Sequence, residues 1–209
     1  RTPMHIGAVA IYDPSTAPGG KVRHKDVLTF VEDRLHLAKT FRQKLANVPM
    51  GVDHPYWVDD AEFDIEYHVR HIALPAPGDW RQFHIQAARL HSLPLDRSRP
   101  LWEAYVIGGL DKLDGIPEGS FAILLKLHHA SVDGDSMQRI MLAMHDLEPG
   151  PSKLALQESP TVIPEVAPGA FPLVLSSYRN AIRRPLKLSK VALKAARDTV
   201  RLRSVQKNG

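Results

Sequence analysis

The sequence contains no cysteine among its 209 residues. A disulfide framework, a thiolate metal site, an iron–sulfur cluster and a cysteine nucleophile are therefore excluded within these residues, which fits a reducing compartment. No apolar run approaches the roughly 18–20 residues that span a bilayer. The longest apolar stretches, at residues 6–12 and 121–125, have the length of strands. We therefore predict that no segment of this sequence crosses a membrane by itself.

Motifs of several catalytic and metal-binding classes are also missing. There is no GxSxG, which disfavours a serine hydrolase. Despite eleven histidines, no HExxH, CxxC or two-histidine, one-carboxylate spacing occurs. His68 and His71 lie three residues apart in a segment with a strand pattern, where this spacing puts two side chains on opposite faces. We expect no bound metal.

The composition is that of a globular protein with an uneven distribution of charge. Hydrophobic residues make up 44% and charged residues 24%, which is sufficient for a packed core. Residues 171–209 hold ten lysines and arginines and one acidic residue, Asp198, whereas residues 1–170 hold 17 basic and 22 acidic residues. A basic arm on a mildly acidic body is typical of attraction to phosphate-bearing surfaces, although a solvated helix face has the same pattern.

Hydrophobic periodicity predicts alternating strands and helices up to about residue 147. Strands are expected at residues 4–12, 56–58, 68–74, 101–110 and 121–129. Helices are expected at 24–40, from a cap at Asp79 to about Ser92, and at 136–147. The strands at 101–110 and 121–129 are separated by a Gly/Pro loop, which indicates a hairpin or neighbouring strands in one sheet.

The last third of the chain has a different character. Residues 148–172 contain six prolines and no periodicity, which predicts a linker. Residues 173–209 have a basic, helical pattern that Pro185 interrupts. We therefore divide the chain into a domain at 1–147, a linker at 148–172 and a basic helical connector at 173–209.

The segment with the strongest chemical potential is the end of the strand at 121–129. His128 and His129 are adjacent, so strand alternation points them to opposite faces and only one can enter a given cleft. Asp133 and Gly134 follow in a tight turn that leads into a helix. This order can position a histidine as a general base. Periodicity alone favours a structural histidine, and both interpretations remain open.

Four motifs in this sequence resemble those of one known family. The pattern formed by His128, His129, Asp133 and Gly134 matches the HHxxxDG motif of acyltransferases related to chloramphenicol acetyltransferase and to peptide-synthetase condensation domains. The PLWE, PMHxG and YHVR…LPxPG segments, at 100–103, 3–7 and 67–78, are similar to those of the bacterial wax ester synthase/diacylglycerol acyltransferase family. The resemblance covers roughly residues 2–150, and the motifs occur in the order of that family.

This resemblance implies a fold and a set of site residues. The implied fold is an α/β, chloramphenicol acetyltransferase-like sandwich, of which residues 1–147 are the N-terminal half, with a mixed sheet and flanking helices. His129 would be the general base, His128 would support it, and Asp133 and Gly134 would shape the turn and the substrate channel. The PLWE segment would either line the acyl or acceptor tunnel or pack in the core. Its candidate substrate-binding residues are Pro100, Leu101, Trp102 and Glu103.

The reaction implied is transfer of a long-chain acyl group from acyl-CoA, a co-substrate, to diacylglycerol or a long-chain alcohol, with no cofactor. The resemblance also implies a C-terminal half of the same enzyme. It further implies a cytoplasmic location, with attachment to the inner membrane face or lipid droplets through residues 171–209. The absence of interleaved aromatics there speaks against nucleic acid. Two alternatives remain: a condensation or polyketide-associated acyltransferase, and a non-catalytic lipid-surface scaffold.

Overall fold

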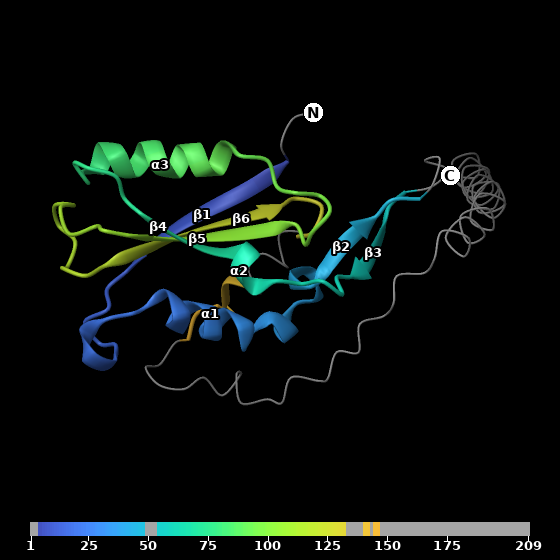
Figure 1. Cartoon of the computed structure of the whole chain (residues 1–209), viewed down its shortest axis with the longest axis horizontal. Helices are drawn as coiled ribbons and strands as arrows, with labels where there is room; N and C mark the ends of the chain where they lie inside the picture. Colours follow the sequence, from blue (N-terminus) through green and yellow to red (C-terminus); the bar gives the residue numbers. More distant parts are fainter. Residues whose placement is uncertain (1–3, 49–53, 133–139, 143, 147–209) are drawn as a thin grey trace, which may run out of the picture. The chain divides into compact units, whose positions relative to one another are not determined.

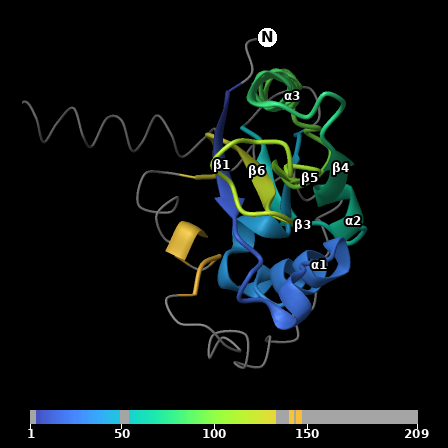
Figure 2. The same ribbon diagram turned by 90° about the vertical axis from the view of Figure 1, so that its left-hand side faces the viewer.

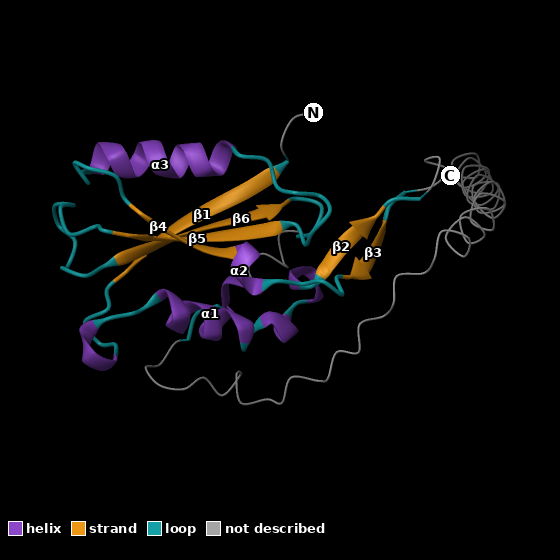
Figure 3. Ribbon diagram, viewed as in Figure 1, coloured by secondary structure: helices purple, strands orange, loops and turns teal. Residues whose placement is uncertain are grey.

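A four-stranded mixed sheet lies at the centre of the computed structural model, which describes residues 4–48, 54–132, 140–142 and 144–146. The strands follow the order β1-β6-β5-β4, and β1 and β5 each run antiparallel to β6, whereas β4 and β5 are parallel (Figure 3). The prediction that 101–110 and 121–129 are neighbours in one sheet is confirmed. The bounds are β1 His5–Tyr12, β4 Val69–Ala73, β5 Trp102–Gly108 and β6 Phe121–His128.

Helices cover both faces of this sheet. Helix α1 (His24–Glu32) and helix α3 (Trp80–Ser92) lie on opposite sides of it (Figures 1 and 2). The Asp79 side chain accepts a hydrogen bond from the Gln82 amide, so the predicted cap and the end of α3 at Ser92 are confirmed. The mixed sheet with flanking helices is the α/β arrangement expected from the sequence.

Alternation along β6 separates two hydrophobic cores. Ile123, Leu125 and Leu127 face α1, whereas Ala122 and Leu124 face α3. The core on the α1 side includes Val27, Val31, Leu35, Phe41, Trp102, Ala104 and Val106. The core on the α3 side includes Phe83, Leu90, Tyr105, Ile107, Leu110 and Leu113. Each side chain at the end of β6 therefore belongs to one of two distinct environments.

The predicted helix at 24–40 is wrong in its extent. Helix α1 ends at Glu32, and two 3₁₀ turns follow, at Leu35–Leu37 and Lys39–Phe41, with Ala38 in an extended conformation between them. The buried residues of both turns join the same core as α1. The apolar spacing was read as one helix because core-facing residues recur at similar intervals in these turns.

The predicted strand at 68–74 begins one residue too early. Helix α2 (Ile65–His68), capped by the Asp64 side chain on the Glu66 amide, ends at His68, and β4 begins at Val69. His68 is therefore the last residue of a helical turn, and the strand spacing assumed between His68 and His71 does not hold.

A second, two-stranded sheet pairs β2 (Gln43–Ala46) with β3 (Tyr56–Asp59). The strand at 56–58 was predicted, and β2 was not. The described residues fall into two units, of which the second holds 46–48 and 54–57, and the first holds the remainder, including the whole four-stranded sheet. Everything discussed below belongs to the first unit.

Several expectations concern residues that the structure does not describe. The linker at 148–172, the basic connector at 173–209 and most of the helix at 136–147 lie outside the described residues, although Ile140, Met141 and Leu142 are helical. Among the helices that are described, none combines the length and the apolarity needed to cross a bilayer.

Candidate acyl-transfer site

The turn after β6 carries the two adjacent histidines. The His128 amide donates to the Leu101 carbonyl and the His129 amide donates to the Met4 carbonyl, at 3.0 and 2.7 Å, so backbone bonding to the neighbouring strands continues to His129. The Thr40 hydroxyl donates to the Ser131 carbonyl at 3.0 Å, which ties the turn to the segment on the α1 side. The turn is thus anchored from both sides of β6.

His129 is exposed, and its ring is held through one nitrogen. Nδ1 lies 3.3 Å from the Val132 carbonyl, which can only accept, so Nδ1 carries the proton. Nε2 then presents its lone pair, and no hydrogen bond within the described residues uses it. Strand alternation continued through the Met4 contact places the side chain on the α1 face. An exposed imidazole with a fixed tautomer can accept a proton from a hydroxyl group.

The ring of His128, unlike that of His129, is turned into the protein. Its Nδ1 accepts a hydrogen bond from the Ala130 amide at 3.1 Å, and its Nε2 is buried without a partner among the described residues. Burial lowers the pKa of His128, and the nearby Arg97, His5 and His129 lower it further. His128 is therefore neutral near pH 7, and it holds the turn that carries His129.

An apolar cavity of about 110 Å³ lies on the α1 face of the sheet. Its volume is of the same order as the ~150 Å³ engineered apolar cavity that binds benzene, so it suits a hydrocarbon segment. Strands β1, β5 and β6, helix α1, Phe41 and the segment around Met141 contribute its lining. The lining residues are Ala8, Val9, Ala10, Tyr12, Val27, Phe30, Val31, Phe41, Trp102, Ala104, Ile123, Leu125, Met141, Met144 and His145.

The PLWE segment is buried throughout, but its side chains lie in different parts of the structure. Trp102 lines the cavity, and its indole N–H donates to the Phe41 carbonyl at 2.9 Å. Pro100 and Leu101 are fully buried and are not among the lining residues. Glu103 belongs to the opposite face of the sheet. Of the four predicted substrate-binding residues of this segment, the structure therefore brings Trp102 to the cavity.

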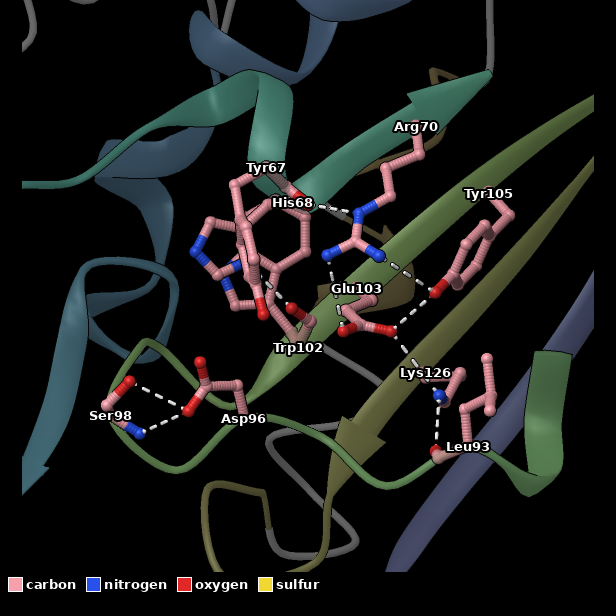
Figure 4. Close-up of polar contacts among 10 residues, drawn as sticks. All are labelled: Tyr67, His68, Arg70, Leu93, Asp96, Ser98, Trp102, Glu103, Tyr105 and Lys126. Atoms are coloured by element: carbon pink, nitrogen blue, oxygen red, sulfur yellow. Dashed lines mark hydrogen bonds and ion pairs between the residues drawn. The ribbon is translucent and has the colours of Figure 1, made fainter. Parts of the chain in front are cut away.

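Glu103 forms the centre of a buried polar network (Figure 4). It lies directly opposite Lys126 in the β5–β6 register, and the ammonium contacts the carboxylate at 3.3 Å and donates to the Leu93 carbonyl at 2.7 Å. The Tyr105 hydroxyl donates to the Glu103 carboxylate at 2.8 Å, and Nη2 of Arg70 lies 3.7 Å from Oε1 of Glu103. Burial and this hydrogen bond raise the pKa of Tyr105 to about 12. The network joins three strands to the residue after α3.

His68 contributes a buried aromatic stack that the sequence did not predict. Its ring lies between those of Phe63 and Trp102, at centroid distances of 5.1 and 4.6 Å, and is close to parallel with both. Its Nδ1 donates to the Trp102 carbonyl at 2.7 Å, as Figure 4 shows, and burial lowers its pKa. The YHVR segment thus supports the tryptophan that lines the cavity. The YHVR motif can be recognised in the sequence, but the contact between His68 and Trp102 can be seen only in the fold.

The PMHxG segment packs against the end of α3. A Cβ at Gly7 would lie 2.6 Å from Nδ1 of His91, so only glycine allows this ring to lie over β1. The His5 ring contacts His91 edge to face and donates to its carbonyl. Gly7 is also opposite Lys126 in the β1–β6 register. The motif residues Gly7 and Glu103 therefore both fix the end of α3, on the face opposite the cavity.

The described residues contain no group of three or more histidines and carboxylates that could hold a metal ion. Two of the predicted site residues, Asp133 and Gly134, lie outside the described residues. The site that can be described therefore consists of His129 on its anchored turn, His128 beneath it, and the cavity with Trp102.

Comparison with known proteins gives a family match over nearly the whole chain. The model of the wax ester synthase/diacylglycerol acyltransferase catalytic domain matches residues 1–208. The Mycobacterium tuberculosis protein Rv3087, named as a candidate diacylglycerol O-acyltransferase, is 36% identical over 98% of this chain and 41% of its own length. The tgs3 protein of the same organism, which carries a similar name, is 38% identical over 88% of this chain and 64% of its own.

Two solved structures are also similar to part of this chain. A wax ester synthase/diacylglycerol acyltransferase from Marinobacter aquaeolei VT8 is 33% identical over 66% of this chain and 33% of its own, with a TM-score of 0.48. The first condensation domain of the calcium-dependent antibiotic synthetase is 18% identical over 68% of this chain and 31% of its own, also with a TM-score of 0.48. The chain spans about two fifths of the length of Rv3087 and just under two thirds of the length of tgs3.

Proposed function

Since the chain belongs to the wax ester synthase/diacylglycerol acyltransferase family, we propose that it takes part in transferring a long-chain acyl group from acyl-CoA to a hydroxyl acceptor. The acceptor is diacylglycerol or a long-chain alcohol, and the product is a triacylglycerol or a wax ester. No cofactor takes part. Because the relatives are longer, we further propose that a C-terminal half completes the site.

The chemistry proposed for His129 follows from its fixed tautomer. The acceptor hydroxyl gives its proton to Nε2 while its oxygen attacks the thioester carbonyl, because an un-ionised alcohol is a poor nucleophile near pH 7. When the tetrahedral intermediate collapses, the carbon–sulfur bond breaks and the imidazolium returns the proton to the leaving thiolate. An ester and free CoA result. The contact from His129 Nδ1 to the Val132 carbonyl is the observation that carries this proposal.

The cavity supplies a place for the hydrocarbon of the substrate. It lies on the face of the sheet to which His129 points, and Phe41, one of its lining residues, follows the Thr40 that contacts the turn. Burying apolar surface there stabilises a bound acyl chain in proportion to the area removed from water. Asp133 and Gly134, and a role for His128 in supporting the base, remain part of the proposal.

Release of CoA tests this proposal directly. We expect palmitoyl-CoA to release CoA, which carries a free thiol, only when a diacylglycerol or a fatty alcohol is present, with the corresponding ester formed in equal amount. A thiol reagent measures the release, and the absence of cysteine removes the protein's own background. Hydrolysis without an acceptor would contradict the proposal. No release with either acceptor, even after the C-terminal half has been added, would also contradict it and would favour a non-catalytic scaffold.

We also propose that residues 171–209 attach the protein to anionic lipid at a membrane or lipid-droplet surface. The support is their sequence, in which basic residues alternate with leucine and valine as in interfacial helices. Flotation with vesicles that contain phosphatidylglycerol should carry the full chain upward, less so at high salt, because salt screens the attraction. Equal flotation of a chain that ends at residue 170 would refute the attachment.

A further inference from the structure

Two polar side chains, Tyr12 and His145, line the apolar cavity where β1 ends. The Tyr12 hydroxyl donates to Nε2 of His145 at 2.8 Å, and Nδ1 of His145 donates to the Met141 carbonyl at 2.7 Å. All N–H and O–H donors of the pair are therefore used within the protein. Burial raises the pKa of Tyr12, so its hydroxyl stays protonated and remains a donor. The two side chains therefore leave no free donor facing the cavity, and they present their rings to a hydrocarbon that enters it.

Tyr12 and His145 form, with Phe121, a wall of three stacked rings. Tyr12 lies between Phe121 and His145, at centroid distances of 5.3 and 6.0 Å and interplanar angles of 18° and 16°. Phe121 is opposite Tyr12 in the β1–β6 register, so the sheet fixes two of the rings. Aromatic rings stacked in this way resist displacement by a flexible chain.

The third ring is held by an anchored segment. Asp146, the residue after His145, pairs with Arg34 at 2.6 Å. The Arg34 side chain is 3% exposed, its guanidinium lies 3.5 Å from the centroid of the Phe30 ring, and it also donates to the Phe30 carbonyl. The Asp146 side chain is 24% exposed, so this partly buried charge pair ties the residue after His145 to the end of α1.

The wall lies far from His129 along the sheet. Trp102 is opposite Leu127, two residues before His129, whereas Tyr12 is opposite Phe121. Phe121 and Leu127 are six residue steps apart on β6, which is about 20 Å at ~3.3 Å per residue. One leaflet of a bilayer is about 15 Å of hydrocarbon, half of the ~30 Å core. The separation is therefore long enough for the hydrocarbon of a long acyl chain.

We propose that the Tyr12–His145 pair sets the upper limit on the length of the acyl chain, by closing the cavity in which the distal hydrocarbon of the substrate binds. This inference rests on the proposed function, because it takes an acyl chain as the occupant. It goes beyond that function by naming the residues that determine chain-length specificity. Neither residue takes part in the chemistry at His129.

Binding of acyl-CoAs without an acceptor tests the proposal independently of catalysis. The probes are saturated acyl-CoAs from decanoyl-CoA to docosanoyl-CoA, below their micellar concentrations, titrated calorimetrically into the full chain. For the wild-type chain we expect affinity to rise about fourfold per added methylene and to level off at a limiting length. Tyr12→Ala should move that limit to longer chains, and His145→Ala should do the same.

Two variants serve as matched controls. Tyr12→Phe keeps the ring stack and should keep the limit, and Ile11→Ala changes a β1 residue that does not line the cavity. An unchanged limit in both alanine variants, with melting temperatures close to wild type, would overturn the inference and leave the proposed function intact. Affinity that does not depend on chain length in the wild type would overturn the inference together with the assignment of the cavity to the acyl chain.

Discussion

Replacing His129 with alanine is expected to slow acyl transfer by about 10²- to 10⁴-fold, the usual contribution of a positioned general base. The alcohol then has no group to take its proton as the new bond to the thioester carbon forms. The substrate cavity lies along the strands and does not include His129, so KM for acyl-CoA should change little. Initial rates of CoA release at saturating acceptor measure the effect on kcat.

Two other histidines provide controls for this variant. His84 is exposed on α3, on the opposite side of the sheet, and His84→Ala should keep the wild-type rate. His128→Ala removes the acceptor for the Ala130 amide, so it should reduce both the rate and the thermal stability. A His129→Ala variant that keeps its activity would exclude this residue as the base and leave the histidines of the turn with a structural role only.

The parts of the fold that the sequence predicted are those with strong local signals. The strand at β1 alternates in burial along its length, and α3 starts at a capping aspartate and has its buried residues on one face. The neighbouring position of β5 and β6 followed from the Gly/Pro loop between them. Each of these signals depends on residues close together in the chain, so no knowledge of the tertiary structure was needed.

The missed features depend on residues that are distant in the chain. Tyr12 and His145 are 133 residues apart, and their hydrogen bond exists only because the sheet and α1 bring the two segments together. The stack of His68 on Trp102 likewise requires β4 beside β5. The histidine turn itself was found by motif, whereas the tautomer of His129 requires the position of the Val132 carbonyl. Local patterns carry no information about such contacts.

The position of Glu103 shows how a motif can be recognised while its physical role is hidden. In the sequence it follows Trp102 and shares its motif, which suggested a common role at the substrate tunnel. Strand alternation instead turns the two side chains to opposite faces, so Trp102 lines the cavity and Glu103 meets Lys126. The glutamate therefore supports the face of the sheet that lies behind the cavity, where the end of α3 packs.

Glu103→Leu is accordingly expected to lower the free energy of unfolding by about 3–5 kcal/mol, the typical cost of removing one partner of a buried ion pair. The ammonium of Lys126 is fully buried and, of its present hydrogen-bond partners, would keep the Leu93 carbonyl and lose the carboxylate. The Tyr105 hydroxyl would also lose its acceptor. Urea unfolding followed by circular dichroism measures the change. The comparison requires that the free energy of unfolding falls with urea concentration at the same slope in the wild-type protein and the variant.

A second substitution separates the loss of the pair from the loss of packing. In Glu103→Leu with Lys126→Met both charges are absent, so no uncompensated ion stays buried, and this double variant should be more stable than Glu103→Leu alone. Asp26→Asn breaks a surface ion pair at the start of α1 but keeps an amide oxygen that can accept from the Arg23 amide, so it should change stability little. Lys126→Met alone completes the comparison. If its loss in the free energy of unfolding and that of Glu103→Leu simply sum to the loss in the double variant, Glu103 and Lys126 do not stabilise the sheet as a pair. The PLWE glutamate would then act through Tyr105 and Arg70, its other partners in the network.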